Sequence, residues 1–257
     1  MFAEKSNLGQ NFLINQTDIN KFVDFCKITK EDVVLEIGIG NGALTQPISQ
    51  KAKKVIGIEI DPVLIKQLYE LSTKYLPAQA GFVLFVEADF LQLDLAKTIK
   101  DHQITKIISA IPYYITSPII HKILKEACTP LKGVYLITQL EFAQKLMGRD
   151  GRRSYFTNLV ERYAKIESGV KISNSSFDPI PKVDSFFFSF EFTKYPKDSV
   201  EFSEWSKFLH HTFKTPRKMI NKRFDKKVLE KLEISETLRA ENLSLEQIEN
   251  LQQELTG

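Results

Sequence analysis

Three glycines at alternate positions follow a short apolar run near the beginning of the chain. Residues 33–37 are rich in β-branched side chains, a pattern typical of a buried parallel strand, and Gly38, Gly40 and Gly42 come directly after them. Glycine permits positive φ and lets the backbone approach a ligand with no Cβ in the way. A helix can start behind this loop. The stretch can therefore place backbone against a bound ligand at the end of a strand.

Acidic residues at the ends of the next two strands fit a ligand that carries adenosine. Glu59 ends the apolar run 55–58 and lies 19 residues after Gly40, a spacing that suits hydrogen bonds to ribose hydroxyls. Asp89 follows the run 82–86, where a carboxylate can accept a hydrogen bond from an adenine amino group. A plain tight turn between a strand and a helix explains any one of these features. It fits poorly with the occurrence of the glycine loop, Glu59 and Asp89 in this order. Together they resemble the class I S-adenosylmethionine (SAM) methyltransferases.

Strand-like and helix-like segments alternate along most of the chain. Further strands are expected at 106–108 and 133–138, so the pattern predicts a doubly wound α/β sheet. Residues 186–192 alternate with period two, which predicts an antiparallel strand with a single buried face. The pattern is helical after residue 196, where we place a domain boundary between residues 1–196 and 197–257. Ser244 and Gln247 predict a capping box at the start of the last helix.

Bulk properties indicate an ordinary globular protein. The chain has 257 residues, of which 43% are hydrophobic and 26% are charged. It has no apolar run of the ~20 residues that a membrane span needs, no apolar signal core, and two distant cysteines typical of reduced thiols. We therefore expect a cytoplasmic protein, and a monomer, because no separate exposed apolar helix face requires a partner. No metal site is expected, since His210 and His211 lack a cysteine or carboxylate at ligand spacing.

Five motifs in chain order resemble the rRNA adenine N6,N6-dimethyltransferases, the KsgA and Erm group. They are residues 9–13 (Gly-Gln-Asn-Phe-Leu), 36–40 (Glu-Ile-Gly-Ile-Gly), 58–61 (Ile-Glu-Ile-Asp), 111–118 (Ile-Pro-Tyr-Tyr-Ile-Thr-Ser-Pro) and 177–185 (Phe-Asp-Pro-Ile-Pro-Lys-Val-Asp-Ser). Residues 238–244 resemble the tail of KsgA rather than that of Erm. The resemblance spans nearly the whole chain. It implies a Rossmann-like SAM-binding methyltransferase domain, a small C-terminal helical domain that contacts RNA, and dimethylation of two adjacent adenines in small-subunit rRNA during ribosome assembly.

The resemblance also implies which residues form the site. The implied SAM-binding residues are Asn11, Leu13, Gly38, Gly40, Glu59, Asp89 and Ala110. The implied catalytic positions are Ala110, Pro112, Tyr113 and Phe177. In the family pattern an asparagine oxygen and the proline carbonyl accept the two N–H bonds of the adenine amine, while the tyrosine stacks on the extruded base. Phe177 would cover the other face of that base.

This chain departs from the family at a position that matters for the chemistry. The family motif is Asn-(Leu/Ile)-Pro-Tyr, whereas this chain has alanine at position 110, which offers no side-chain acceptor. Loss of one pre-organised polar contact typically costs about 10²–10³ in rate. Three explanations remain open: a deliberate replacement that traps an inactive form, drift toward a non-catalytic role, or substitution by a neighbour such as Ser109. We expect an intact fold and cofactor site with impaired catalysis.

Basic segments provide candidate RNA contacts. Eight Lys or Arg residues and one aspartate lie between residues 207 and 227, with phenylalanines interleaved. This pattern fits a phosphate-tracking surface, and a solvated helix face explains it equally well. The basic loop 147–154 has the same two explanations. The predicted RNA-binding residues are Arg149, Arg152, Arg153, Lys214, Arg217, Lys218, Lys222 and Arg223.

Two other functions are consistent with the sequence. A non-catalytic ribosome-assembly or transcription accessory factor would use the same fold, and Ala110 keeps this alternative open. An Erm-like enzyme would act on large-subunit rRNA, and the tail at 238–244 disfavours it. Labelled SAM with under-methylated small subunits separates the enzyme from the binding factor.

Overall fold

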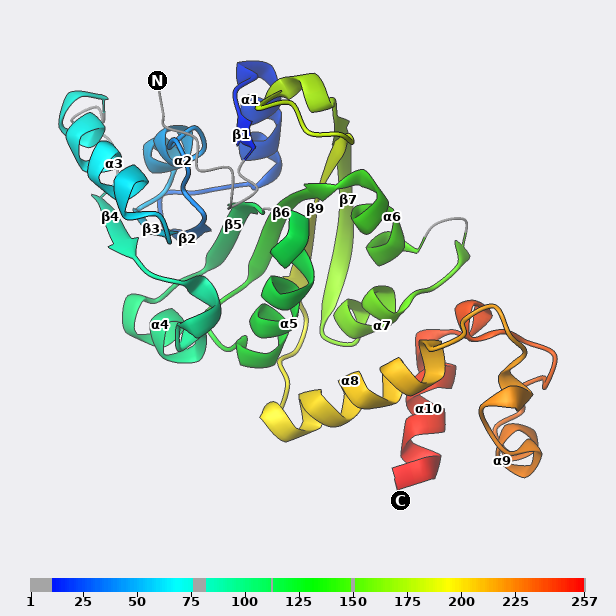
Figure 1. The fold of residues 1–257 in the computed structure, drawn as a ribbon. Coiled ribbons are helices and arrows are strands. Elements are labelled where there is room, and N and C mark those ends of the chain that lie inside the picture. Colours follow the sequence, from blue (N-terminus) through cyan, green and yellow to red (C-terminus); the bar gives the residue numbers. More distant parts are fainter. Residues whose placement is uncertain (1–10, 76–81, 112, 149–150, 257) are drawn as a thin grey trace.

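The computed structural model describes residues 11–75, 82–111, 113–148 and 151–256, in which a seven-stranded sheet carries helices on both faces (Figure 1). The strands lie in the order β4-β3-β2-β5-β6-β9-β7. Those from β4 to β6 pair in parallel, whereas β9 pairs antiparallel with both β6 and β7. The strands of this sheet are β2 (Val33–Ile37), β3 (Lys54–Glu59), β4 (Phe82–Glu87), β5 (Lys106–Ala110), β6 (Gly133–Gln139), β7 (Ala164–Ile172) and β9 (Ser185–Phe192).

Helices connect the parallel strands and cover the sheet, which confirms the predicted doubly wound α/β fold. A separate two-stranded pair joins β1 (Phe12–Leu13) to β8 (Phe177–Asp178), two segments far apart in the sequence. The helices are α1 (Gln16–Phe25), α2 (Thr45–Lys51), α3 (Pro62–Tyr75), α4 (Leu95–His102), α5 (Thr116–Glu126), α6 (Leu140–Met147), α7 (Tyr155–Glu161), α8 (Ser199–Phe213), α9 (Lys226–Lys231) and α10 (Leu245–Thr256). None of these described helices combines the length and apolar character needed to cross a bilayer.

Apolar side chains pack against both faces of the central strands. Val34 belongs to the cluster that includes α1 and α2, whereas the next residue, Leu35, belongs to the cluster that includes α4 and α5. Both side chains are fully buried. Successive side chains of a strand point to opposite faces, so burial on both faces requires the continuous apolar run that the sequence shows.

The predicted single buried face of residues 186–192 is wrong. Phe187 packs in the cluster on one side of β9, and Phe188 and Phe190 pack in the cluster on the other. Ser189 is also fully buried. The reason is topological, because β9 lies between β6 and β7 inside the sheet and helices cover it from both sides.

The C-terminal helices pack onto the sheet domain through a continuous apolar cluster. β9 ends at Phe192 and α8 begins at Ser199, on either side of residue 196. The cluster that covers β5 and β6 also contains Trp205 and Leu209 of α8 and Leu251 of α10. The division into two domains at residue 196 therefore stays a prediction, with an extensive interface between the two parts.

Arg162, which follows α7, ties this interface together. Its guanidinium forms an ion pair with Glu201 on α8 at 2.9 Å and donates to Gln252 Oε1 on α10 at 2.8 Å. It also lies 4.3 Å from the ring centroid of Trp205, a cation–π arrangement. One planar group thus joins α7, α8 and α10.

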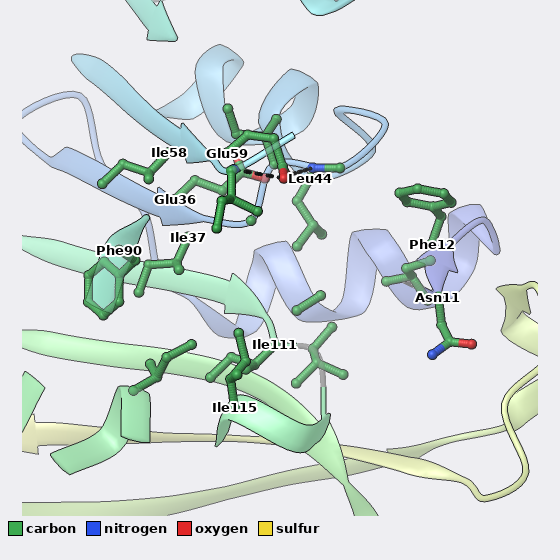
Figure 2. A pocket seen from close by; sticks show the side chains of 18 of the residues that line it. Asn11, Phe12, Glu36, Ile37, Leu44, Ile58, Glu59, Phe90, Ile111 and Ile115 are labelled. Atoms are coloured by element: carbon green, nitrogen blue, oxygen red, sulfur yellow. Dashed lines mark hydrogen bonds between the residues drawn. The ribbon is translucent and has the colours of Figure 1, made fainter. Parts of the chain in front are cut away.

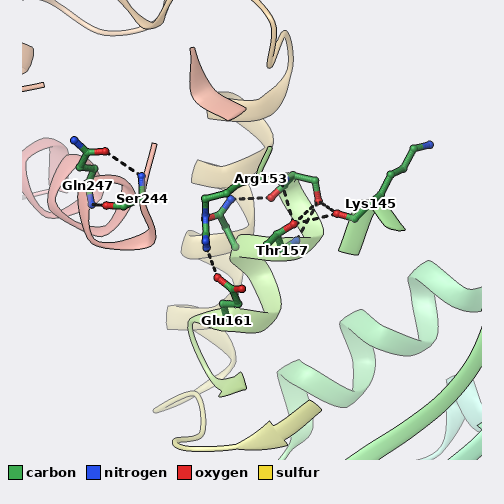
Figure 3. Close-up of polar contacts among 8 residues, drawn as sticks. Lys145, Arg153, Thr157, Glu161, Ser244 and Gln247 are labelled. Carbon is green, nitrogen blue, oxygen red and sulfur yellow. Dashed lines mark hydrogen bonds and ion pairs between the residues drawn. The ribbon is translucent and has the colours of Figure 1, made fainter. Parts of the chain in front are cut away.

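The predicted capping box at the start of α10 is confirmed. Ser244 Oγ accepts a hydrogen bond from the Gln247 backbone N–H at 3.1 Å, and Gln247 Oε1 accepts one from the Ser244 N–H at 3.0 Å (Figure 3). These reciprocal bonds satisfy two backbone donors that the first turn of a helix leaves unpaired.

Candidate active site

A cavity of about 320 Å³ lies at the carboxyl ends of the central strands (Figure 2). β2 pairs with β3 on one side and with β5 on the other. Successive strands are therefore added on opposite sides of β2, which makes this position the point where the strand order reverses. Open α/β sheets bind ligands outside such a switch point. Eight residues predicted from the sequence line the cavity: Asn11, Leu13, Gly38, Gly40, Glu59, Asp89, Ala110 and Phe177.

The glycine loop depends on backbone conformation at Gly38 and on both conformation and close packing at Gly40. Gly38 and Gly40 adopt φ values of 69° and 58°, in the left-handed region that favours glycine. A Cβ on Gly40 would also lie 3.0 Å from two ring carbons of Phe12. In β3, a Cβ on Gly57 would lie 2.5 Å from Ile39 Cδ1. Glycine at position 57 therefore allows Ile39 of the loop to pack against β3.

Glu59 holds the loop and presents an acceptor to the cavity. Its Oε2 accepts the Gly40 N–H at 3.0 Å, and its Oε1 accepts the N–H groups of Ile60 at 2.9 Å and Asp61 at 3.0 Å. Two carboxylate oxygens together offer about four acceptor positions. The three backbone donors leave acceptor capacity on Oε2, which suits a hydroxyl group in the cavity.

Glu36 is a second carboxyl group at the cavity, in a different environment. Its side chain projects from β2, is 1% exposed, and its Oε2 has no hydrogen-bond partner within the described residues. Burial raises the pKa of Glu36 to about 8, the Thr45 hydroxyl opposes this rise, and the Glu59 carboxylate adds to it. The Glu36 carboxyl group is therefore largely protonated at neutral pH. It lies beside the Glu59 carboxylate, which accepts hydrogen bonds from backbone N–H groups.

Three further predicted cofactor contacts lie after β4 and in the N-terminal segment. Asp89 follows β4, and its Oδ1 accepts the Leu91 N–H at 2.9 Å, which fixes the carboxylate at the cavity wall. Asn11 and Leu13 come from the N-terminal segment. The pairing of Leu13 with Phe177 brings these two residues to the cavity from distant parts of the chain.

Ala110 and Phe177 form part of the apolar wall of the cavity. Ala110 ends β5 and is half-buried beside its β6 partner Ile137, while Phe177 is 3% exposed. Ser109 does not line the cavity, because its side chain is fully buried and its Oγ donates to the Ile37 carbonyl at 2.5 Å. It therefore does not replace the missing asparagine. Pro112 lies outside the described residues. Tyr113 starts the 3₁₀ turn Tyr113–Ile115, and its side chain also lies outside what the structure describes.

Sequence reasoning missed several cavity residues. Phe12 packs on the glycine loop, and Ile60 and Tyr114 line the cavity with 51% and 62% of their surface exposed. Ile60 follows Glu59 directly at a strand end, which is the signal that could have identified it. Tyr114 belongs to the motif at residues 111–118, and that motif is the signal for it.

The predicted RNA-binding residues differ in their surroundings. Arg152, Lys214, Arg217, Lys218 and Lys222 are exposed. Arg149 lies outside the described residues.

Two of these arginines are engaged within the protein. Arg153 pairs with Glu161, as Figure 3 shows. It also donates from Nε to Asn158 Oδ1 at 2.8 Å. Arg223 is half-buried and donates to Thr215 Oγ1 at 2.8 Å. Both contacts stabilise the fold locally and reduce the capacity of these side chains to bind phosphate.

Comparisons with known proteins agree with this geometry. A family model described as ribosomal RNA adenine dimethylase matches residues 1–256. The chain is 36% identical over 258 residues to "Ribosomal RNA small subunit methyltransferase A" of Fusobacterium nucleatum, covering 95% of both chains. It is 32% identical over 263 residues to the protein of the same name from Alkaliphilus oremlandii, covering 96% of this chain and 90% of that protein.

Solved structures show the same overall fold. A dimethyladenosine transferase from Plasmodium falciparum superposes with a TM-score of 0.78 at 27% identity, covering 95% of this chain and 97% of that one. The 23S rRNA methyltransferase ErmE gives a TM-score of 0.73 at 25% identity, covering 96% and 100%. No cluster of three or more potential metal ligands occurs among the residues that the structure describes. The chain belongs to the ribosomal RNA adenine dimethylase family.

Proposed function

We propose that this protein uses SAM to dimethylate N6 of two adjacent adenines in small-subunit rRNA during ribosome assembly, in the cytoplasm and as a monomer. The observation that carries the proposal is a single cavity that joins the glycine loop and Glu59 to Ala110 and Phe177. Relatives that share 32–36% identity over nearly the whole chain are named small-subunit methyltransferases. ErmE, which acts on 23S rRNA, shares 25%, so the small subunit is the preferred target.

The residues at the cavity fit the nucleoside part of SAM. Gly38 and Gly40 bring backbone to the cavity without a side chain of their own. Glu59 would accept from a ribose hydroxyl through Oε2, and Asp89 from the adenine amino group. Asn11, Leu13 and Gly38 complete the proposed cofactor contacts. When bound, SAM supplies a methyl group on a positively charged sulfur.

The protein's part in the reaction is mainly to position the target base. An adenine amine is a poor nucleophile because its lone pair is conjugated with the ring. The base would be extruded from the RNA into the cavity, with Phe177, which lines the cavity, against one face. Tyr113 is proposed to stack on the other face, as the family motif implies. The Pro112 carbonyl would accept one N–H. Positioning and electrostatics then supply most of the rate enhancement.

Exposed basic residues would hold the RNA by its phosphates. Arg152, Lys214, Arg217, Lys218 and Lys222 are the proposed contacts, because their side chains are exposed. Arg153 and Arg223, which hydrogen-bond within the protein, are proposed to shape this surface instead.

Replacement of Glu59 by glutamine should weaken cofactor binding about 10- to 100-fold. The amide nitrogen of glutamine is a donor, so it cannot accept both the Gly40 N–H and a ribose hydroxyl as the carboxylate does. Calorimetry with S-adenosylhomocysteine measures the dissociation constant. Glu31→Gln, at an exposed turn before β2, is the control and should bind as the wild type does. Equal affinity of Glu59→Gln and wild type would contradict the assigned role.

Labelled SAM and under-methylated small subunits test the proposed function. We expect label in N6-dimethyladenosine at two adjacent positions of the small-subunit rRNA, and none in large subunits. Binding to small subunits without incorporation would overturn the enzymatic proposal. Label in large-subunit rRNA alone would support an Erm-like target instead.

A non-catalytic assembly factor is the second candidate, and the surroundings of Ala110 favour it. Neither Ala110 nor its strand neighbour Ile137 has a side-chain acceptor, and the Ser109 hydroxyl is buried away from the cavity. Such a factor would bind the same subunits and SAM while turning over slowly or not at all. The assay above separates the two candidates.

A further inference from the structure

Tyr114 is an exposed aromatic side chain at the mouth of the cavity. It lines the cavity although 62% of its surface is exposed. Within the described part of the chain, its ring has no aromatic partner and its hydroxyl forms no hydrogen bond. Most of the surface of Tyr114 is therefore available to a ligand.

The backbone that carries Tyr114 is firmly anchored. The 3₁₀ turn Tyr113–Ile115 runs directly into α5, where Thr116 is 2% and Ile119 is 1% exposed. Ile115 and Ile119 also line the cavity. The ring is thus presented from a packed helix start, which lowers the entropy lost when a ligand contacts it.

Neighbouring residues of a 3₁₀ turn project about 120° apart, because the turn has three residues per repeat. Adjacent positions of this turn can therefore contact different groups, and Tyr114 has its own place at the cavity. If position 113 contacts the extruded base, position 114 is available to a group outside the cavity. A base next to an extruded one has lost a stacking partner, and an exposed aromatic ring can replace it.

We propose that Tyr114 is a stacking platform for the nucleotide that neighbours the target adenine. The inference rests on the proposed function, since it requires an RNA substrate with an extruded base. It assigns Tyr114 a positioning role, distinct from the residues that contact the reacting amine. The platform would hold one of the two adjacent adenines while the other occupies the cavity.

A double-mutant cycle tests the contact between Tyr114 and the neighbouring base. The binding partners are under-methylated small subunits, and subunits assembled with uridine in place of the neighbouring adenine. Tyr114→Ala should weaken binding to normal subunits about 10- to 100-fold, whereas Tyr114→Phe should retain wild-type affinity. The uridine substitution should weaken binding of the wild type but not further weaken Tyr114→Ala. The midpoint of urea unfolding should be unchanged in Tyr114→Ala, which reports an intact fold.

Phe82→Ala is the matched control, because Phe82 is an aromatic residue with 65% exposure that does not line the cavity. The inference would be overturned if Tyr114→Ala bound small subunits as tightly as the wild type does. It would also be overturned if the losses in affinity caused by Tyr114→Ala and by the uridine substitution were additive. Either result would leave the proposed function in place. A wild-type protein that does not bind small subunits would overturn both.

Discussion

The Ala110→Asn variant should methylate small-subunit rRNA about 10²–10³ times faster than the wild-type protein. Ala110 ends β5 and lines the cavity, and the adjacent Ser109 hydroxyl donates to Ile37 instead of facing it. An asparagine oxygen at this position would accept one N–H of the adenine amine. The nitrogen lone pair would then be directed at the methyl group. Single-turnover rates with saturating labelled SAM and excess enzyme measure this step.

Ala110→Leu is the control for this prediction. Leucine has the same branched shape and number of side-chain heavy atoms as asparagine but no acceptor, so it separates filling of the cavity from hydrogen bonding. We expect the leucine variant to be no faster than the wild type. Equal gains in both variants would attribute the effect to packing, and no gain with asparagine would show that this acceptor does not limit the rate.

The contribution of Glu36 to stability should fall between pH 4.5 and about 8, and Glu36→Gln should remove this fall. The pKa of Glu36 is raised from 4.5 to about 8 in the folded protein, first because the group is buried. The stability associated with its bound proton is fully present below pH 4.5 and is lost as the pH rises toward about 8. The loss of this contribution lowers the free energy of unfolding by on the order of 5 kcal/mol.

Urea unfolding at a series of pH values between 4.5 and 8.5 measures this effect. The free energy of unfolding of Glu36→Gln should decline less steeply than that of the wild type, so that the variant is the more stable at pH 8. Glu31→Gln, an exposed substitution before β2, should follow the wild-type curve. Parallel curves for Glu36→Gln and wild type would show that Glu36 is not protonated in the folded state.

Local sequence was enough to predict the cofactor half of the site. Gly40 and Glu59 are separated by one helix and one strand, and parallel strands joined in this way place their carboxyl ends at the same edge of the sheet. Hydrophobic patterns mark these strands because helices cover them on both faces. The observed hydrogen bond between the Gly40 N–H and Glu59 follows from that short-range arrangement.

Contacts between distant segments were decided only by the tertiary structure. The sequence indicated a one-sided strand at 186–192, but the position of β9 between β6 and β7 buries both of its faces. Charge alone suggested RNA contact for Arg153, yet folding brings it to Glu161 and Asn158. A sequence pattern shows the periodicity and the charge of a segment. It does not show which other segment will contact it in the folded protein.

By itself, then, the sequence determined the strand–loop–helix unit, the acidic residues at the strand ends and the alanine at position 110. The tertiary structure decided that Phe12 covers Gly40, that the pairing of β1 with β8 brings Phe177 to the cavity, and that Ser109 faces away from it. The physical reason is that spacing along the chain fixes neighbours within one βαβ unit. Neighbours across the sheet depend on the packing of the whole domain.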